Sequence, residues 1–98
     1  MAFNEKVWNL TKNIPEGMVS TYGEIAKALD TKAYRAVGNA LNRNPHAPIV
    51  PCHRVVNADG KLGGFAFGPE KKIKILKEEG IIVKDGKVAD FEKKLFRF

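Results

Sequence analysis

The sequence has few residues suited to covalent or metal chemistry. Among its 98 residues are one cysteine, Cys52, and two histidines, His46 and His53. A single cysteine excludes an intramolecular disulfide, so the fold must be stable without one. A zinc site takes about four Cys, His or carboxylate ligands. We therefore expect neither a disulfide nor a bound metal.

Long apolar runs are missing as well. No stretch approaches the roughly 18 apolar residues of a membrane span, and the first ten residues, MAFNEKVWNL, lack the layout of a signal peptide. The segment GKLGGFAFG is rich in glycine but lacks the GK[ST] ending of a nucleotide-binding loop. We expect an intracellular protein with no membrane attachment and no cofactor.

The chain also has no internal repeat and no low-complexity linker. Its 98 residues, 44% of them hydrophobic, suffice for one small core, so we expect residues 1–98 to form a single domain. The formal net charge of +6 makes a polyanion a plausible partner. A basic surface without a partner explains the same charge, and composition alone leaves both explanations open.

Helical patterns fill the first half of the chain. Apolar residues at helical spacing predict a helix over residues 3–12. The sequence TYGE at 21–24 fits a capping box, in which the Thr21 hydroxyl and the Glu24 carboxylate each satisfy an amide at a helix start. A helix over 22–29 should follow, and its apolar residues should face the core.

A second helix is expected over residues 33–42, after a turn at 30–32. Two short helices with a tight turn are typical of a helix-turn-helix, whose second helix commonly enters a nucleic-acid groove. A plain helical hairpin remains the alternative. Small residues recur on the second helix, which would allow it to approach another surface closely; they are Ala33, Ala36, Gly38 and Ala40. Arg35 among them either reaches DNA or is simply solvated.

The rest of the chain predicts a rigid loop, a helix and a hairpin. Asn44-Pro45 ends the second helix, and three prolines make residues 45–51 an extended, rigid loop. A helix over 69–79 begins at a proline and stops before Gly80. Asp85-Gly86 between apolar residues indicates a β-hairpin.

Cys52 stands beside His53 in the sequence IVPCHRVV, which leaves three interpretations open. A buried structural cysteine is the common fate of a lone thiol. A metal ligand lacks enough partners. A nucleophile is possible because the adjacent imidazole can take the thiol proton if a third group orients the ring. Arg54 either contacts a phosphate or forms a structural ion pair.

The order of several motifs resembles the active-site, carboxy-terminal domain of the O6-alkylguanine-DNA alkyltransferases. The motifs are PCHRV, TYGEIA, RAVGNAL, RNP and GKLGGFAFG, and the resemblance covers about residues 3–80, leaving a tail at 81–98. It implies a mainly α fold with a small β-hairpin, a winged-helix-like helix-turn-helix DNA-binding domain. That fold would flip a damaged guanine out of the base stack, where chemistry on a base is blocked.

The resemblance also implies the chemistry of a single-turnover DNA-repair methyltransferase. Cys52 would accept the alkyl group from O6-alkylguanine, and His53 would act as base through a water. Glu79 would polarise His53, and Tyr22 would protonate the departing guanine. The thioether on Cys52 is stable, so each molecule should react once.

Further positions match residues that bind the base or the DNA in that family. The substrate-binding set would be Asn44, Val55, Phe65 and Ala66. The DNA-binding set would be Arg35, which fills the gap left by the flipped nucleotide, together with Ala36 and Thr21. The expected partner is double-stranded DNA containing O6-alkylguanine, bound through the minor groove by a monomer.

The chain departs from the family in two ways. Many relatives carry tyrosine, serine and glycine at Phe65, Ala66 and Phe67; a bulky Phe67 would narrow the pocket and favour methyl groups over larger adducts. Most relatives also carry an amino-terminal domain, so this chain is either a minimal protein or a fragment. Two other functions stay open: recognition of alkylated DNA without repair, and a helix-turn-helix regulator with a redox cysteine.

Overall fold

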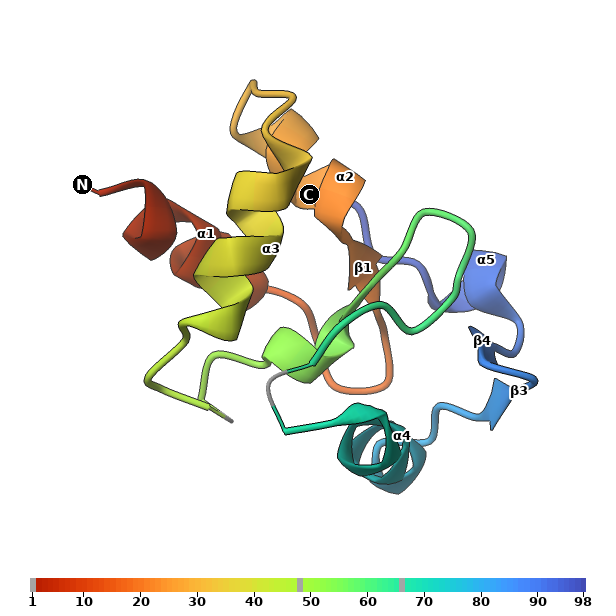
Figure 1. The fold of residues 1–98 in the computed structure, drawn as a ribbon. Helices are drawn as coiled ribbons and strands as arrows, with labels where there is room; N and C mark the ends of the chain where they lie inside the picture. The colour runs from red at the N-terminus through yellow and green to blue at the C-terminus, as the bar shows by residue number, and fades with distance from the viewer. Residues whose placement is uncertain (1, 48, 66) are drawn as a thin grey trace.

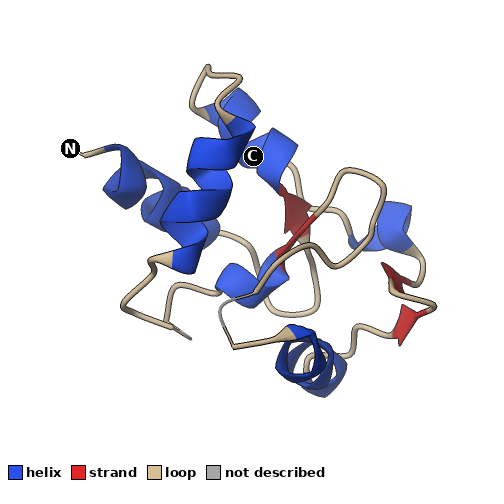
Figure 2. Ribbon diagram, in the orientation of Figure 1, coloured by secondary structure: helices blue, strands red, loops and turns tan. Residues whose placement is uncertain are grey.

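The computed structural model describes residues 2–47, 49–65 and 67–98. The chain is mainly helical with a few very short strands, one pair near the middle of the view and one at its edge (Figures 1 and 2). In chain order the elements are α1 (Phe3–Thr11), β1 (Ser20–Thr21), α2 (Tyr22–Ala28), α3 (Tyr34–Asn42), the 3-10 helix η1 (Cys52–Arg54), β2 (Val55–Val56), α4 (Pro69–Glu78), β3 (Val83–Lys84), β4 (Lys87–Val88) and α5 (Phe91–Lys94). No helix of the described residues is both long enough and apolar enough to cross a membrane.

The first three helices pack around one core. Helix α3 lies against both α1 and α2, as Figure 1 shows. The buried residues of this core are Val7, Ile14, Ile25, Ala26, Val37, Ala40, Leu41, Cys52 and Val55. The Trp8 Nε1–H donates to the Ala40 carbonyl over 2.8 Å and so fixes α1 on α3. The predicted helices are confirmed to within about one residue at their ends.

The start of α2 confirms half of the predicted capping box. The Thr21 hydroxyl accepts a hydrogen bond from the Glu24 amide over 3.0 Å. The Glu24 carboxylate, however, lies 3.3 Å from Arg97 Nε. The expected contact of that carboxylate with a helix-start amide is therefore wrong, because Thr21 already belongs to β1 and the acidic group pairs with the C-terminal segment.

Helices α2 and α3 pack against each other across the predicted turn, and the small residues of α3 lie on two sides of it. Ala40 is fully buried and belongs to the core, whereas the Cβ position of Gly38 has open space around it. The exposed side of α3 also carries Tyr34, Arg35, Asn39 and Asn42. Ala40 serves helix packing, because a larger side chain at this position would push α3 away from α1.

The loop before η1 is not extended. The Val50 amide donates to the His46 carbonyl over 2.9 Å, which brings these two residues together. The Asn44 side chain closes the same turn from inside, since its Nδ2 donates to the Val50 carbonyl and its Oδ1 accepts from the His46 amide. Local hydrogen bonds of this kind override the extended preference that prolines impart.

A parallel pair of two-residue strands joins the helical half to the rest of the chain. In β1 and β2, Ser20 pairs with Val55 and Thr21 with Val56. A second core lies beyond this pair and contains Val19, Val56, Leu62, Leu76, Ile81 and Val88. The predicted hairpin is confirmed as antiparallel β3 and β4, with Asp85 and Gly86 both at positive φ in its turn.

Candidate active site

The thiol of Cys52 lies at the start of η1, where the loop from α3 meets β2. Cys52 is 8% exposed, and its amide donates to the Val50 carbonyl over 2.8 Å. The same carbonyl accepts from Asn44 Nδ2. The end of α3 is thereby connected directly to the backbone that presents the thiol.

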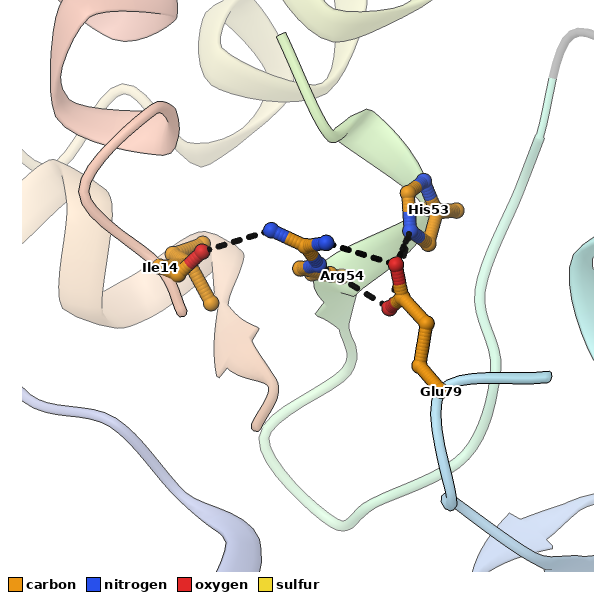
Figure 3. Close-up of polar contacts among 4 residues, drawn as sticks. All are labelled: Ile14, His53, Arg54 and Glu79. Atoms are coloured by element: carbon orange, nitrogen blue, oxygen red, sulfur yellow. Dashed lines mark hydrogen bonds and ion pairs between the residues drawn. The ribbon is translucent and has the colours of Figure 1, made fainter. Parts of the chain in front are cut away.

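His53 and Arg54, the two residues after Cys52 in the chain, form one hydrogen-bonded group with Glu79 (Figure 3). His53 Nε2 lies 3.1 Å from each carboxylate oxygen of Glu79. Arg54 holds the same carboxylate with two hydrogen bonds, Nε to Oε1 at 2.9 Å and Nη2 to Oε2 at 2.6 Å. Arg54 Nη1 also donates to the Ile14 carbonyl over 2.8 Å. Arg54 therefore serves an ion pair, which settles the choice that the sequence left open.

This arrangement fixes the state of the imidazole. A neutral ring that donates through Nε2 keeps the lone pair on Nδ1, so Nδ1 is the nitrogen that can take a proton. Burial lowers the pKa of His53; the hydrogen bond and charge of Glu79 oppose this effect, and the positive charges of Arg54 and Lys72 add to it. The ring is consequently neutral, and able to accept a proton, at neutral pH.

The carboxylate of Glu79 stays ionised. Partial burial alone would raise its pKa, but the hydrogen bonds from Arg54 and His53 outweigh burial and the pKa of Glu79 is lowered. Glu79 is the residue that ends α4, since its amide donates to the Ile75 and Leu76 carbonyls and Gly80 follows at φ 86°. The end of the helix places this acid opposite η1.

Tyr22, the first residue of α2, reaches the same region from the other side. Its hydroxyl donates to the Gly64 carbonyl over 3.3 Å. A Cβ on Gly63 would lie 3.0 Å from the Tyr22 Oη and from Asn57 Oδ1, and Gly63 has a φ of 70°. Burial, and then the negative charge of the nearby Cys52 thiolate, raise the pKa of Tyr22. The phenol thus remains protonated and can donate.

Lys72 is a buried cation that the sequence analysis missed. It is fully buried on α4, and its Nζ donates to three backbone carbonyls: Val55 at 2.7 Å, Leu62 at 2.5 Å and Gly64 at 3.1 Å. Burial lowers the pKa of Lys72 to about 8, and the negative charge of Cys52 opposes that effect. Lys72 ties β2 to the loop that follows it.

Only one of the two missed features, the burial of Lys72, had a signal in the sequence. Lys72 precedes the buried Leu76 by four residues, which places both on the same face of α4. A lysine in such a position is usually assumed to reach solvent, so its burial was not anticipated. The role of Gly63 has no comparable local signal, because it depends on Tyr22 from a distant part of the chain.

The other residues predicted to bind the base or to shape its pocket are Val55, Phe65, Ala66 and Phe67. Val55 is fully buried, and Phe65 is partly buried against the first core with its ring 5.9 Å from Lys72 Nζ. Phe67 is 58% exposed, and its ring packs edge-on to that of Phe65. Ala66 lies outside the described residues.

The predicted DNA-binding residues lie on α2 and α3. A hollow of about 630 Å³ is lined by Tyr22, Gly23, Tyr34, Arg35, Gly38, Asn39, Asn42, Asn57, Ala58 and Gly64. Arg35 is exposed at its edge and Ala36 is half-buried. Thr21 is 5% exposed with its hydroxyl engaged in the helix cap, so it is the least accessible of the three. The hollow connects the exposed side of α3 with Tyr22.

Within the described ranges, no three His, Cys, Asp or Glu side chains come together in a way that could hold a metal ion. The hydrogen bonds of η1 instead give an oriented, neutral imidazole at His53, the residue that follows the Cys52 thiol in the chain. Such a pair is the usual means of activating a cysteine nucleophile.

Comparison with known proteins places this geometry in context. The sequence model described as "6-O-methylguanine DNA methyltransferase, DNA binding domain" matches residues 2–81. A methylated-DNA--protein-cysteine methyltransferase of Methanosarcina acetivorans is 58% identical over 79 residues, which are 80% of this chain and 51% of that protein. The chain thus spans about half the length of this relative and of a second curated relative, 51% and 49%.

The chain is also similar to solved structures. The crystal structure of Mycobacterium tuberculosis OGT in complex with DNA is 45% identical with a TM-score of 0.77, and the match covers 81% of this chain and 50% of that one. S. pombe Atl1, in complex with damaged DNA containing O6-carboxymethylguanine, is 30% identical with a TM-score of 0.82. That match covers 98% of this chain and 95% of Atl1.

Proposed function

The chain belongs to the 6-O-methylguanine DNA methyltransferase family, and on that premise we propose that it repairs O6-alkylguanine in double-stranded DNA by moving the alkyl group onto its own Cys52. The observation that carries the proposal is the contact with Glu79 made by His53, the residue that follows Cys52 in the chain. The protein would act as a methylated-DNA–[protein]-cysteine S-methyltransferase that reacts once.

The transfer step uses the thiol and the oriented imidazole. The Cys52 proton passes through a water to Nδ1 of His53, and the thiolate sulfur attacks the alkyl carbon. The new S–C bond forms as the bond from that carbon to the guanine oxygen breaks. Glu79, held by Arg54, stabilises the imidazolium that results.

The departing guanine develops negative charge and needs a proton. Tyr22 supplies this proton. Its raised pKa keeps the phenol protonated, and its hydroxyl lies beside the Gly64 carbonyl. The products are an unmodified guanine and a neutral thioether, and the proton that His53 took from Cys52 returns through solvent to the Tyr22 phenolate, so that both side chains end neutral. No cofactor enters this balance, and nothing in the scheme regenerates the thiol.

Backbone groups around the thiol would hold the flipped base. The carbonyls of Cys52 and Val55 would accept from the guanine amino group, while Phe65 would stack on the base and the Ala66 amide would contact its 6-oxygen. Asn44 would act indirectly by fixing the turn that ends at Cys52. Phe67 would limit the size of the adduct.

DNA would bind along α2 and α3, used as the helix-turn-helix of a winged-helix-like domain. Arg35 would enter the base stack from the minor groove and fill the space of the flipped nucleotide. Ala36 and Thr21 would lie close to the sugar-phosphate backbone. The net charge of +6 would make binding salt-sensitive. The protein would work as a monomer inside the cell, where its DNA is.

A second candidate is recognition of alkylated DNA without repair. The match to Atl1 over nearly the whole of both chains favours it, since Atl1 was crystallised with damaged DNA. Relatives that only recognise the damage replace the cysteine with another residue, whereas this chain has Cys52. The thiol therefore makes transfer the first candidate.

The two candidates separate in a repair assay on DNA. A duplex carries one O6-methylguanine within a restriction site, so that cleavage reports restored guanine. We expect wild-type protein to restore one site per molecule, Arg35→Ala to do so more slowly, and Cys52→Ser not at all. Preferential binding of the damaged duplex without any restored site would replace repair by recognition.

A further inference from the structure

We propose that the C-terminal segment, residues 83–98, is a positioning element of the active site that braces both the base-binding loop and the strand leading to Tyr22. This segment lies beyond the match to the family model, which ends at residue 81. The inference rests on the proposed function and adds to it a part of the chain to which the family resemblance gives no role.

The hairpin holds the loop that follows β2. The Val88 amide donates to the Gly60 carbonyl over 2.9 Å, and the Leu62 amide donates to the Gly86 carbonyl over 3.2 Å. Lys61, between these residues, forms an antiparallel bridge with Lys87 on β4. Residues 60–62 are thereby joined to the hairpin by two hydrogen bonds and an isolated bridge.

A close side-chain contact seats the segment on the same loop. A Cβ on Gly60 would lie 3.1 Å from Phe91 Cγ, and Gly60 has a φ of 87°. The Phe91 ring therefore packs where only glycine leaves room. Val88 and Leu62 share the second core, so the contact is continuous with buried apolar surface.

The braced residues lead directly into the site. Both backbone polar groups of Leu62 are hydrogen-bonded: its amide donates to the Gly86 carbonyl, and its carbonyl accepts from Lys72 Nζ. The next two residues are Gly63, which packs against Tyr22, and Gly64, whose carbonyl accepts from Tyr22. A shift of the hairpin would consequently move the acceptor of the proposed proton donor.

The end of the segment binds the other side of the site. The Val19 amide donates to the Lys94 carbonyl over 2.9 Å, and the Phe96 amide donates to the Val19 carbonyl over 2.7 Å. The Ser20 hydroxyl adds a hydrogen bond to the Phe96 carbonyl over 2.8 Å. Val19 and Ser20 run directly into Thr21 and Tyr22.

The C-terminal segment therefore contacts both structures that meet at Tyr22. In Figure 1 it runs in blue from α4 through the hairpin and α5 and ends near α2. The exposed side of α3 lies outside these contacts. Loss of the brace should affect the transfer step more than binding of undamaged DNA.

The test replaces Phe91 by alanine in the full chain, with Phe98→Ala as the matched control. Phe98 is in the same segment, is 40% exposed, and contacts the Phe96 ring edge-on. We measure the rate constant of methyl transfer at saturating damaged duplex and the Kd for undamaged duplex. Amide hydrogen exchange at Leu62 reports the loop itself.

We expect Phe91→Ala to slow transfer by about tenfold, because a small displacement of a positioning group has a large effect on rate. Its Leu62 amide should exchange faster, and its Kd for undamaged duplex should stay within about twofold, as should every value for Phe98→Ala. If Phe91→Ala does not fold, Ser20→Ala serves in its place and should slow transfer in the same direction.

Transfer at the wild-type rate in Phe91→Ala, together with faster exchange at Leu62, would overturn the inference and leave the proposed function intact. Absence of transfer in the wild-type protein would instead remove the proposed function and, with it, the role assigned to the brace. The two failures are therefore distinguishable.

Discussion

His53 Nε2 lies 3.1 Å from both carboxylate oxygens of Glu79, although 25 residues separate the two in the chain. The contact exists because α4 ends at Glu79 directly opposite η1, and because Arg54 holds the carboxylate in place. It orients the imidazole of the residue that follows Cys52 and is the basis of the proposed chemistry.

Replacement of Glu79 by glutamine should slow methyl transfer. Glutamine keeps the shape but loses the negative charge that stabilises the imidazolium, so the rate constant should fall by on the order of tenfold to a hundredfold. Glu78→Gln, one residue earlier on the exposed side of α4, is the control. Single-turnover kinetics at saturating damaged duplex measure both. Equal rates for the two variants would show that the charge at Glu79 is not used.

The pH dependence of transfer should reflect a histidine with a lowered pKa. His53 must be neutral to accept a proton, and burial keeps its pKa below the usual 6.5. The rate should therefore decline as the pH falls, with a midpoint below pH 6.5. His46→Gln, which changes the exposed histidine, should leave the profile unaltered. A midpoint above pH 6.5 would contradict this account.

The same histidine affects stability with a defined sign. Below pH 6.5 the unfolded chain binds a proton at His53 that the folded chain does not bind, so the free energy of unfolding should fall as the pH falls.

Replacement of Lys72 by methionine should change how stability depends on pH. At neutral pH the variant loses three hydrogen bonds to carbonyls, and we expect about 1–3 kcal/mol of destabilisation. The pKa of Lys72 is about 8 in the folded chain against 10.5 ordinarily. Between these values the unfolded chain binds the extra proton, so the wild type gains stability with rising pH.

The Lys72→Met variant should lack this gain in stability with rising pH. Urea titrations at several pH values should measure this difference. Above pH 8 the free energy of unfolding of the wild type should increase relative to that of Lys72→Met, by up to about 1.4 kcal/mol per pH unit. Lys74→Met removes an exposed lysine from the same helix and should follow the wild type. Parallel stability curves for the wild type and Lys72→Met would contradict the lowered pKa.

Replacement of Gly63 by alanine should disturb Tyr22. The new Cβ would meet Tyr22 Oη and Asn57 Oδ1 at 3.0 Å, at a φ of 70° that side chains rarely adopt. We expect a loss of about 1–2 kcal/mol in the free energy of unfolding, together with slower transfer. Gly64→Ala is the stability control, because no heavy atom lies within 4 Å of its Cβ position. A Gly63→Ala protein as stable as Gly64→Ala would show that the loop has room to adjust.

The sequence predicted the elements whose signals are local. Thr21 caps α2, Pro69 opens α4, and Asp85-Gly86 turns the hairpin, each through interactions within a few residues. The approach of Glu79 to His53 was expected from the family resemblance, since nothing local in the sequence requires it.

Elements that depend on distant partners could not be predicted in the same way. The parallel pair of β1 and β2 has only two residues on each side and joins Ser20 to Val55. The burial of Lys72 depends on carbonyls of β2 and the following loop, and the Glu24 carboxylate found Arg97 rather than its own helix start. The turn before Cys52 formed because Asn44 closes it, which composition does not reveal.

The most direct test of the central claim is the intact mass of the protein after incubation with a duplex containing one O6-methylguanine. Peptide mapping follows, and Cys52→Ser is the control. The account predicts a gain of one methyl group, never more than one per molecule, located on Cys52 and absent from the control. An unchanged mass in the presence of excess damaged duplex, or a methyl group on any other residue, would contradict it.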